Sequence, residues 1–340
     1  MAIDSPGLRA VAFNGLISED VMNQIWDISR IPLPLTDAIG SDSHGNEYCE
    51  WTQDRLQAAV TDNAQIDGAD TISIDDTNSG VRVGNNSQIS VKVVKVSTRA
   101  QESDTIGFSN ALAYQVMMRQ RELRRDVEAQ IHTNQASVKA VTGATAGVSA
   151  GLGAWIATNA SVGATGAVGG FNPATGIVDA RGLGTARALT ETLVREASKN
   201  VFEQGGEASL FCARPVVTEA FSTYLFTSSA RIAALQSEVN QQQSPVTATG
   251  AVNVFVSDFS VLTMVANRLQ PQTAADTSDV FILDPNLIRL SYLHGYRVEP
   301  LAKQGLADTR QMCVDYSLKV LNEEGLGLVA DIDETAPVTT

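Results

Sequence analysis

A strictly alternating segment near the C-terminal end constrains the fold of this chain more than any other feature. Within residues 309–321, every second residue from Met312 to Val320 is apolar, and the residues between them are mostly polar. A period of two places alternate side chains on opposite faces of a strand, so the segment predicts one long, half-buried β-strand. Its inward face would carry Met312, Val314, Tyr316, Leu318 and Val320. Residues 280–283 and 287–293 predict two earlier strands, separated by the turn triplet Asp284-Pro285-Asn286.

The 340-residue chain is acidic but otherwise has the composition of an ordinary folded protein. It carries 24 Lys+Arg against 38 Asp+Glu, a net charge of −14, and 44% of its residues are hydrophobic. A chain of this length can bury a large core and hold two or three substructures. Its acidity argues against a protein that grips DNA through many phosphate contacts.

The cysteines and the first residues bear on the cellular compartment. Cys49, Cys212 and Cys313 are odd in number and widely spaced, which favours reduced thiols in a cytoplasm over a disulfide framework. We expect no signal peptide, because the first residues lack a basic region followed by an apolar one. We also expect no membrane span, because no stretch approaches the ~20 strongly apolar residues that it requires.

The first third of the sequence predicts projecting structures rather than a core. Residues 1–45 indicate an extended arm with one short helix at 21–31. Residues 46–105 predict β structure, in which 81–83 and 89–93 flank the turn sequence Gly84-Asn85-Asn86-Ser87 and form a two-stranded hairpin. An acidic loop at 67–76 precedes this hairpin. Because a two-stranded hairpin is marginal by itself, it must pack on something, and a neighbouring subunit is a candidate.

The clearest helix covers residues 106–133, where apolar residues recur every three to four positions. Such a helix would span roughly 40 Å, a length that suits a structural spine. Its other face carries the four arginines Arg119, Arg121, Arg124 and Arg125. They indicate either a basic stripe that faces nucleic acid or a partner, or a solvated face relieved by Glu122, Asp126 and Glu128. We favour the solvated face, because charge runs on helices are commonly just that.

Residues 140–178 contain no charged side chain and are rich in Gly, Ala, Thr and Ser. They predict a large loop that is flexible or depends on a partner. Regular structure resumes with a helix capped by Thr190 and ended by Gly205-Gly206, a strand at 209–213 and a helix opened by Pro215. Residues 252–256 and 261–266 predict further strands. Helices and strands without a βαβ rhythm indicate an α+β protein.

Several short motifs resemble enzyme or ligand signatures without their context. Gly147-Val148-Ser149-Ala150-Gly151 matches the G-x-S-x-G nucleophile elbow, with Asp258 or Asp284 and then His294 in hydrolase order. The elbow needs a buried strand before the serine, whereas the flanks here are small residues, so we attribute the match to composition. Residues 325–330 resemble G-x-G-x-x-A, and Asn85 and Asn159 open glycosylation sequons. His44, His132 and His294 have no metal-ligand spacing. We therefore predict no catalytic residue, cofactor or metal.

The order of these elements is similar to that of the major capsid proteins of tailed bacteriophages, which share the HK97-type fold, and most closely to the podovirus-like branch. The segment Glu50-Trp51-Thr52-Gln53-Asp54-Arg55-Leu56 resembles the hairpin arm of that family. Trp155-Ile156-Ala157-Thr158-Asn159 resembles its loop segment, and residues 258–268, 280–284, 301–305 and 310–323 resemble its C-terminal half. The resemblance extends over most of the chain, from about Tyr48 to Asp333.

This resemblance implies an α+β, HK97-like fold divided into five parts along the chain. These are an N-terminal arm (1–45), an extended β-hairpin arm or E-loop (46–105), a first part of a peripheral domain (106–204), an axial domain (205–300), and a second part of the peripheral domain with a tail (301–340). The first peripheral part would hold the spine helix, the Gly-rich loop and the helix at 190–204.

The resemblance also implies a structural role in the virion and a set of partners. Copies of the chain would form hexamers and pentamers of an icosahedral shell, assembled in the host cytoplasm, that encloses double-stranded DNA without binding it specifically. The expected partners are a portal protein, a separate scaffolding protein and a decoration or cement protein. Inter-subunit contacts are expected from Trp51, Arg55, Arg82, Lys92, Lys95 and Trp155. The four arginines of the spine helix would face the lumen or a partner. The alternatives are a serine hydrolase that uses Ser149, and a decoration or tube subunit.

Overall fold

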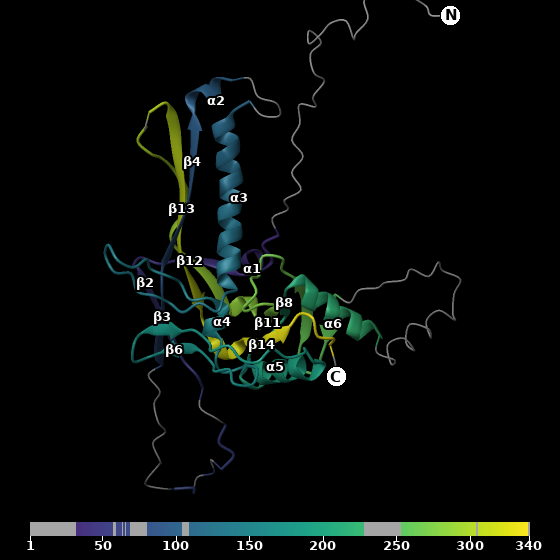
Figure 1. Ribbon diagram of the computed structural model, residues 1–340. Helices are drawn as coiled ribbons and strands as arrows, with labels where there is room; N and C mark the ends of the chain where they lie inside the picture. Colours follow the sequence, from purple (N-terminus) through teal and green to yellow (C-terminus); the bar gives the residue numbers. More distant parts are fainter. Residues whose placement is uncertain are drawn as a thin grey trace, which may run out of the picture.

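The computed structural model describes residues 32–56, 59–62, 64, 66–68, 80–103, 109–227, 253–303 and 305–338. The helix expected at 21–31 and most of the acidic loop at 67–76 lie outside these residues. Figure 1 shows an elongated part, built on a long helix and the strands beside it, next to a compact part that contains two shorter helices. Within the described ranges, no helix combines the length and the apolar character needed to cross a membrane.

A six-stranded mixed sheet forms the centre of the compact part. Its order is β5 (Ala160–Ser161), β14 (Gly327–Asp333), β11 (Thr277–Leu283), β8 (Leu210–Ala213), β10 (Val261–Ala266) and β9 (Val254–Val256). Every residue of β11 is buried, as expected for a central strand that is covered on both faces. Two helices pack on this sheet, α5 (Glu191–Glu203) near β14 and α6 (Pro215–Thr227) near β10. The predicted cap of α5 is confirmed, because the Thr190 hydroxyl accepts a hydrogen bond from the backbone N–H of Leu193 at 3.2 Å.

A four-stranded sheet supports the elongated part. Its order is β1 (Gly40–Ser43), β12 (Ile288–Pro300), β13 (Ala307–Val320) and β4 (Gln88–Ser97). The predicted alternation of β13 is confirmed, since its five inward residues are each at most 1% exposed. The turn before β12 is also confirmed, because Asp284 caps the 3-10 turn η2 (Pro285–Leu287) by accepting from Asn286 N at 2.9 Å.

The spine helix α3 (Ala111–Ile131) lies along β4 and β13 (Figure 1). It buries Leu123, Val127 and Ile131 against the sheet, in agreement with the predicted apolar stripe. The helix begins at Ala111, five residues later than predicted, because the Asn110 side chain caps it by accepting from Ala113 N at 2.9 Å. Two short helices flank the sheet, α1 (Pro34–Ala38) and α2 (Thr98–Glu102).

The predicted hairpin with its turn at residues 84–87 is wrong. β3 (Val81–Asn86) pairs antiparallel with β2 (Tyr48–Gln53), whereas β4 pairs with β13. Residues 84–86 therefore belong to a strand, and at Ser87 the chain passes from one sheet to the next. The polar, turn-like sequence misled the prediction because its side chains find buried partners instead of solvent. The hairpin arm of this molecule is β2–β3, with residues 54–80 between the strands.

The charge-free tract at 140–178 is ordered within its own subunit, contrary to the prediction. It contains α4 (Leu152–Trp155), β5, the strand β6 (Gly170–Asn172) and the start of β7 (Ile177–Asp179). Every residue of α4 is buried. The absence of charge allows this burial, and glycine allows close approach: a Cβ added at Gly151 would lie 2.2 Å from the carbonyl oxygen of Thr133.

The sheets do not follow the predicted boundary at residue 300. β12, expected in the axial domain, pairs with β13 in the sheet beside the spine helix. β14, expected in the peripheral domain, lies in the six-stranded sheet next to β11. The G-x-G-x-x-A resemblance at 325–330 is in fact the 3-10 turn η3 (Glu323–Gly325) followed by this buried strand.

Candidate subunit interface

The hairpin arm leaves the body of the molecule beside a cluster of aromatic rings. Trp51 of β2 lies 5.5 Å from Trp155 of α4 between ring centroids, and Trp155 stacks on Phe171 of β6 at 6.3 Å. Such pairs contribute about 0.5–1.5 kcal/mol beyond the burial of their area. Trp155 is only 1% exposed, so this predicted inter-subunit contact is instead a core residue of its own subunit. Trp51 is partly buried on it and holds the inner half of the arm in place.

The two arginines predicted as contacts on the arm both form ion pairs within the subunit. Arg82 of β3 pairs with Glu50 on the facing strand, and Arg55 pairs with Glu324 at 3.1 Å. Their side chains remain 71% and 64% exposed, and ion pairs with this exposure add little to stability. Both guanidinium groups therefore stay accessible at the surface of the arm.

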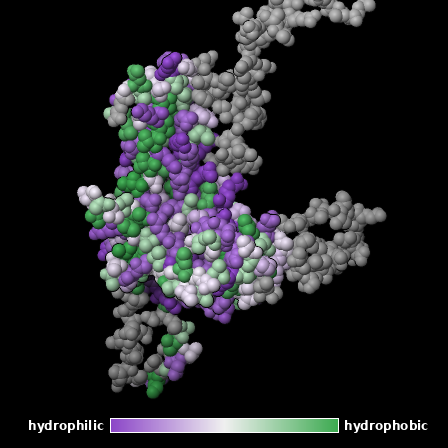
Figure 2. All heavy atoms as spheres, in the orientation of Figure 1, coloured by the Kyte–Doolittle hydropathy of each residue, from purple (hydrophilic) through white to green (hydrophobic). Residues whose placement is uncertain are grey.

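The strand β4 presents an apolar row on its outer face. Val94 and Val96 are buried on the α3 side, whereas Ile89, Val91 and Val93 on the opposite side are 68%, 43% and 53% exposed. Figure 2 shows hydrophobic residues gathered over β4 and β13, beside the more hydrophilic surface of α3. Exposed apolar residues in a continuous row are typical of surfaces that another molecule covers.

The two lysines predicted as contacts both lie on β4. Lys92 points toward the spine helix, where its ammonium lies 2.7 Å from a carboxylate oxygen of Asp126. Lys95 is exposed, and its strand position faces Thr309 of β13. Of the two, Lys95 is thus the one that the subunit leaves open on its surface.

The four arginines of α3 do not form one stripe. At about 100° per residue, Arg119 lies on the opposite side of the helix from the other three. It pairs with Glu122 on the next turn, and the Arg124 guanidinium lies 5.4 Å from the ring centroid of Tyr296. Arg125 lines a surface hollow with Lys92 and Asp126. The four arginines thus have different surroundings on the helix, and their role toward solvent, a lumen or a partner stays a prediction.

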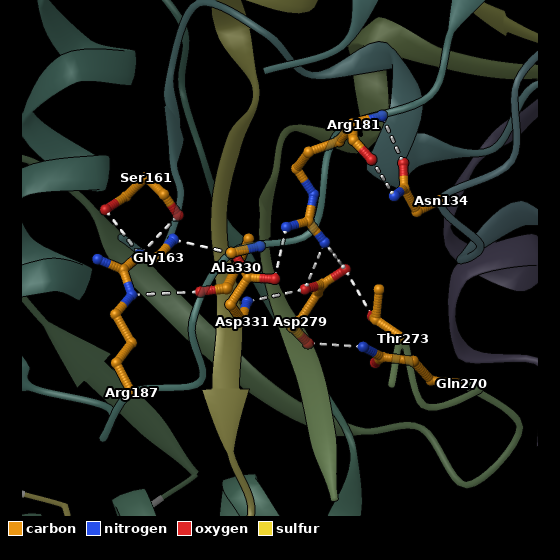
Figure 3. Close-up of polar contacts among 11 residues, drawn as sticks. Asn134, Ser161, Gly163, Arg181, Arg187, Gln270, Thr273, Asp279, Ala330 and Asp331 are labelled. Carbon is orange, nitrogen blue, oxygen red and sulfur yellow. Dashed lines mark hydrogen bonds and ion pairs between the residues drawn. The ribbon is translucent and has the colours of Figure 1, made fainter. Parts of the chain in front are cut away.

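A buried ionic cluster, absent from the sequence predictions, joins the elongated part to the compact part (Figure 3). Arg181 donates to Asp279 at 2.9 Å and to Asp331 at 2.9 Å, and all three side chains are at most 2% exposed. The backbone of Arg181 exchanges two hydrogen bonds of 2.8 Å with the Asn134 side chain, just after α3. Asp331, at φ 59°, also accepts from the N–H of Gly163 at 2.9 Å. The available signal was an aspartate inside an otherwise apolar strand, which requires a buried partner.

A second buried carboxylate fixes the start of the described chain. Glu128 of α3 is fully buried and accepts hydrogen bonds from the backbone N–H groups of Leu35 (3.1 Å) and Thr36 (2.9 Å). Asn267, at the end of β10, donates to the same carboxylate at 2.8 Å. This contact therefore holds α1 against the spine helix.

The comparisons with known proteins agree with this architecture. The family model of the SU10 major capsid protein matches residues 8–333. The chain belongs to this family. It is a major capsid protein of a tailed bacteriophage, as the resemblance predicted. No curated protein matches the sequence.

Solved structures show that this capsid protein has the HK97-like fold. A capsid chain of a native gene transfer agent (GTA) particle has a TM-score of 0.57 at 12% identity, covering 96% of this chain and 99% of that chain. A chain from Mycobacterium phage Bobi has a TM-score of 0.56 at 11% identity, with coverage of 96% and 99%. The SrpI encapsulin of Synechococcus elongatus PCC 7942 has a TM-score of 0.55 at 12% identity, with coverage of 97% and 98%.

The hydrolase motif has a structural role in the capsid protein. Ser149 is 2% exposed, and its hydroxyl accepts hydrogen bonds from Leu318 N at 3.0 Å and from Asn85 Nδ2 at 3.2 Å. It is followed by a four-residue helix, α4, and not by the longer helix that a nucleophile elbow requires. Asn85, the first residue of a glycosylation sequon, is fully buried beside it. The serine of the G-x-S-x-G motif and the asparagine of the sequon are thus hydrogen-bonded to each other inside the subunit.

All three cysteines are free and buried. Cys212 lies 3.6 Å from His132 Nε2, and burial raises the pKa of its thiol to about 12. Burial also lowers the pKa of His132, so the imidazole is kept neutral. A thiol with such a pKa is a poor nucleophile, and the pair serves packing.

Proposed function

We propose that this capsid protein assembles into hexamers and pentamers that close an icosahedral shell around double-stranded DNA. The observation that carries the proposal is the exposed apolar surface of the hairpin arm. Leu56, Val60 and Ile66, beyond the end of β2, are 93%, 71% and 82% exposed. Covering such side chains with another molecule removes apolar area from water and stabilises the contact. A neighbouring copy supplies that cover in a closed shell.

In this proposal the two sheets correspond to the two domains of the fold. The six-stranded sheet with α5 and α6 is the axial domain, directed toward the capsomer centre. The four-stranded sheet with α3 is the peripheral domain. The hairpin arm lies across a neighbour and uses Trp51, Arg55 and Arg82 at the contact, where Lys95 of β4 belongs to the surface that receives it. The N-terminal arm, predicted as residues 1–45, clamps an adjacent subunit.

Charge supports the same arrangement. Residues 56–80 contain five aspartates and neither lysine nor arginine. The neighbouring surface around β4 and α3 presents Lys95, Arg121 and Arg124, which are exposed. The complementarity would orient the arm of one copy on the spine of the next. The net charge of −14 keeps the inner wall from gripping DNA tightly.

The proposed partners are a portal protein at one vertex, a separate scaffolding protein during assembly and a decoration or cement protein on the finished shell. The chain acts as a structural subunit without catalysis, assembles in the host cytoplasm and resides in the virion. The burial of Ser149 supports the absence of hydrolase activity.

The proposal is tested by expressing the chain with and without the scaffolding protein and following assembly by sedimentation and electron microscopy. We expect closed shells from the wild type with the scaffold present. The triple variant L56S/V60S/I66S should remain a folded, soluble subunit and form no shells. L183S, which replaces a 49% exposed leucine away from the arm, is the matched control and should assemble normally. Shells of the triple variant at wild-type yield, or a wild type that stays monomeric with the scaffold, would contradict the proposal.

A further inference from the structure

Three consecutive polar residues are buried where the hairpin arm meets the body. Asn85, Asn86 and Ser87 are 0%, 2% and 5% exposed. Burial along β3 changes over a short distance, since Val81 and Arg82 are exposed whereas its last four residues are buried. A buried amide or hydroxyl group costs free energy unless it is hydrogen-bonded. The partners of these residues therefore show what holds the base of the arm.

Asn85 uses both ends of its amide. Its Nδ2 donates to the backbone oxygen of Leu318 at 2.8 Å and to the Ser149 hydroxyl at 3.2 Å. Its Oδ1 accepts from the backbone N–H of Ala150 at 3.1 Å. The Ser149 hydroxyl in turn accepts from the backbone N–H of Leu318 at 3.0 Å. One asparagine and one serine thus join the arm, the long strand β13 and the segment before α4.

The neighbouring residues continue this attachment. The Ser317 hydroxyl donates to the backbone oxygen of Asn86 at 3.2 Å. Ser87 donates to the backbone oxygen of Glu47 through its N–H at 2.8 Å and its hydroxyl at 2.7 Å. Because Glu47 precedes β2 and Ser87 follows β3, this contact closes the base of the hairpin. His44 Nε2 lies 3.0 Å from the Ser87 hydroxyl.

The outer end of the arm is attached to the body through more exposed and longer contacts. Gln53 Nε2 donates to the backbone oxygen of Val320 at 3.4 Å, and the 64% exposed Arg55 pairs with Glu324. β2 ends at Gln53, and β3 begins after Gly80, which has a φ of 73° that favours glycine. Leu56, which follows the end of β2, is almost fully exposed. Among the described residues, the buried polar contacts of the arm are therefore concentrated at its base.

We propose that Asn85 and Ser149 form a lock that fixes the direction in which the hairpin arm leaves its subunit. Asn85 acts as a positioning residue and needs no contact with a neighbour. The lock is a property of the single subunit, whereas its importance for assembly rests on the proposed function. The lock gives a structural role to the serine of the G-x-S-x-G motif and to the asparagine of the sequon at Asn85.

Hydrogen exchange of the full-length chain, followed by mass spectrometry, tests the lock. In the wild type, amides of residues 81–86 should exchange at least tenfold more slowly than those of residues 59–62. N85A should accelerate exchange at 81–86 about tenfold or more, because it removes three hydrogen bonds. The matched control is N159A, since Asn159 is 4% exposed and donates to two backbone oxygens elsewhere. N159A should leave the exchange rates of residues 81–86 unchanged when they are normalised to those of α5.

A milder pair keeps the test decisive if N85A does not fold. S149A removes the hydroxyl that Leu318 and Asn85 share, and S198A removes an equally buried hydroxyl in α5. S149A should accelerate hydrogen exchange at residues 81–86 and nowhere else. S198A should not change the exchange of these residues. The lock is overturned if N85A and N159A, or S149A and S198A, change residues 81–86 equally. It is also overturned if the wild-type base exchanges as fast as residues 59–62.

Assembly of the same variants separates this inference from the proposed function. A variant with a loosened base should give fewer closed shells than its control at equal solubility. If the base loosens and shells still form at wild-type yield, the lock stands and the role of the arm in the shell fails. If shells are lost without any change in exchange at 81–86, the lock fails.

Discussion

The centre of the six-stranded sheet and the edge of the four-stranded sheet differ in how far the single chain of this capsid protein buries them. In the six-stranded sheet, the central strand β11 is buried along its whole length between helices and neighbouring strands. In the four-stranded sheet, β13 buries its inward residues, but β4 at the edge leaves Ile89, Val91 and Val93 exposed. The centre of the first sheet therefore resembles the core of an ordinary globular protein, whereas the edge strand β4 of the second retains a row of apolar residues that another molecule can cover.

This difference teaches that stability and assembly draw on different residues. Burial in the six-stranded sheet and its ionic cluster should determine whether the subunit folds. The outer face of β4 and the hairpin arm should determine whether folded subunits associate. Substitutions in the two regions can show whether the separation is real.

The largest effect is expected from the ionic cluster. R181M leaves Asp279 and Asp331 buried without their cation, which should lower the free energy of unfolding by about 3–5 kcal/mol. Urea denaturation followed by circular dichroism measures it. K199A, which breaks an exposed ion pair with Glu203 on α5, should cost less than about 0.5 kcal/mol. A loss below about 1 kcal/mol in R181M would show that the compact part does not depend on the cluster.

An intermediate effect is expected from His132. Burial lowers its pKa in the folded state, so below the ordinary value of 6.5 the unfolded chain takes up a proton that the folded chain resists. Stability should thus be fully present above about pH 6.5 and fall on acidification, by up to about 1.4 kcal/mol per pH unit. Urea denaturation at several pH values measures the slope. H132Q should reduce the pH dependence of the free energy of unfolding between pH 6.5 and 5.5. An unchanged dependence would show that other titrating groups cause it.

The smallest effect on stability, and a large one on assembly, is expected from β4. I89S/V93S replaces two exposed side chains, so the free energy of unfolding should change by less than about 0.5 kcal/mol per site. The yield of shells should nevertheless fall, as measured by sedimentation. V94S, on the buried side of the same strand, should instead destabilise the subunit. Normal assembly of I89S/V93S would remove β4 from the contact surface.

Much of the fold was predictable, because periodicity reports burial directly. The alternation in β13, the apolar stripe of α3 and the Thr190 cap are local patterns with one structural solution each. The pairing of β3 was not predictable, because Asn85-Asn86-Ser87 reads as a solvent-exposed turn unless its partners Ser149 and Leu318 are known.

The candidate interface was predicted less well than the fold. Trp155 is a core residue and not the expected contact, because large aromatics serve both in cores and at interfaces and only three-dimensional packing distinguishes the two. The Arg181 cluster joins residues far apart in the sequence, and single-sequence patterns hold no information on such pairs. Arg55, Arg82 and Lys95 lie on accessible surfaces, and their contact with a neighbour stays a prediction.

The burial of all three cysteines has a practical consequence. A particle built from this subunit would offer maleimide reagents no reactive native thiol, so a cysteine introduced at an exposed site would be the sole point of conjugation on each copy. Dyes, enzymes or antigens could then be displayed at one defined position per subunit, with no need to remove native residues first.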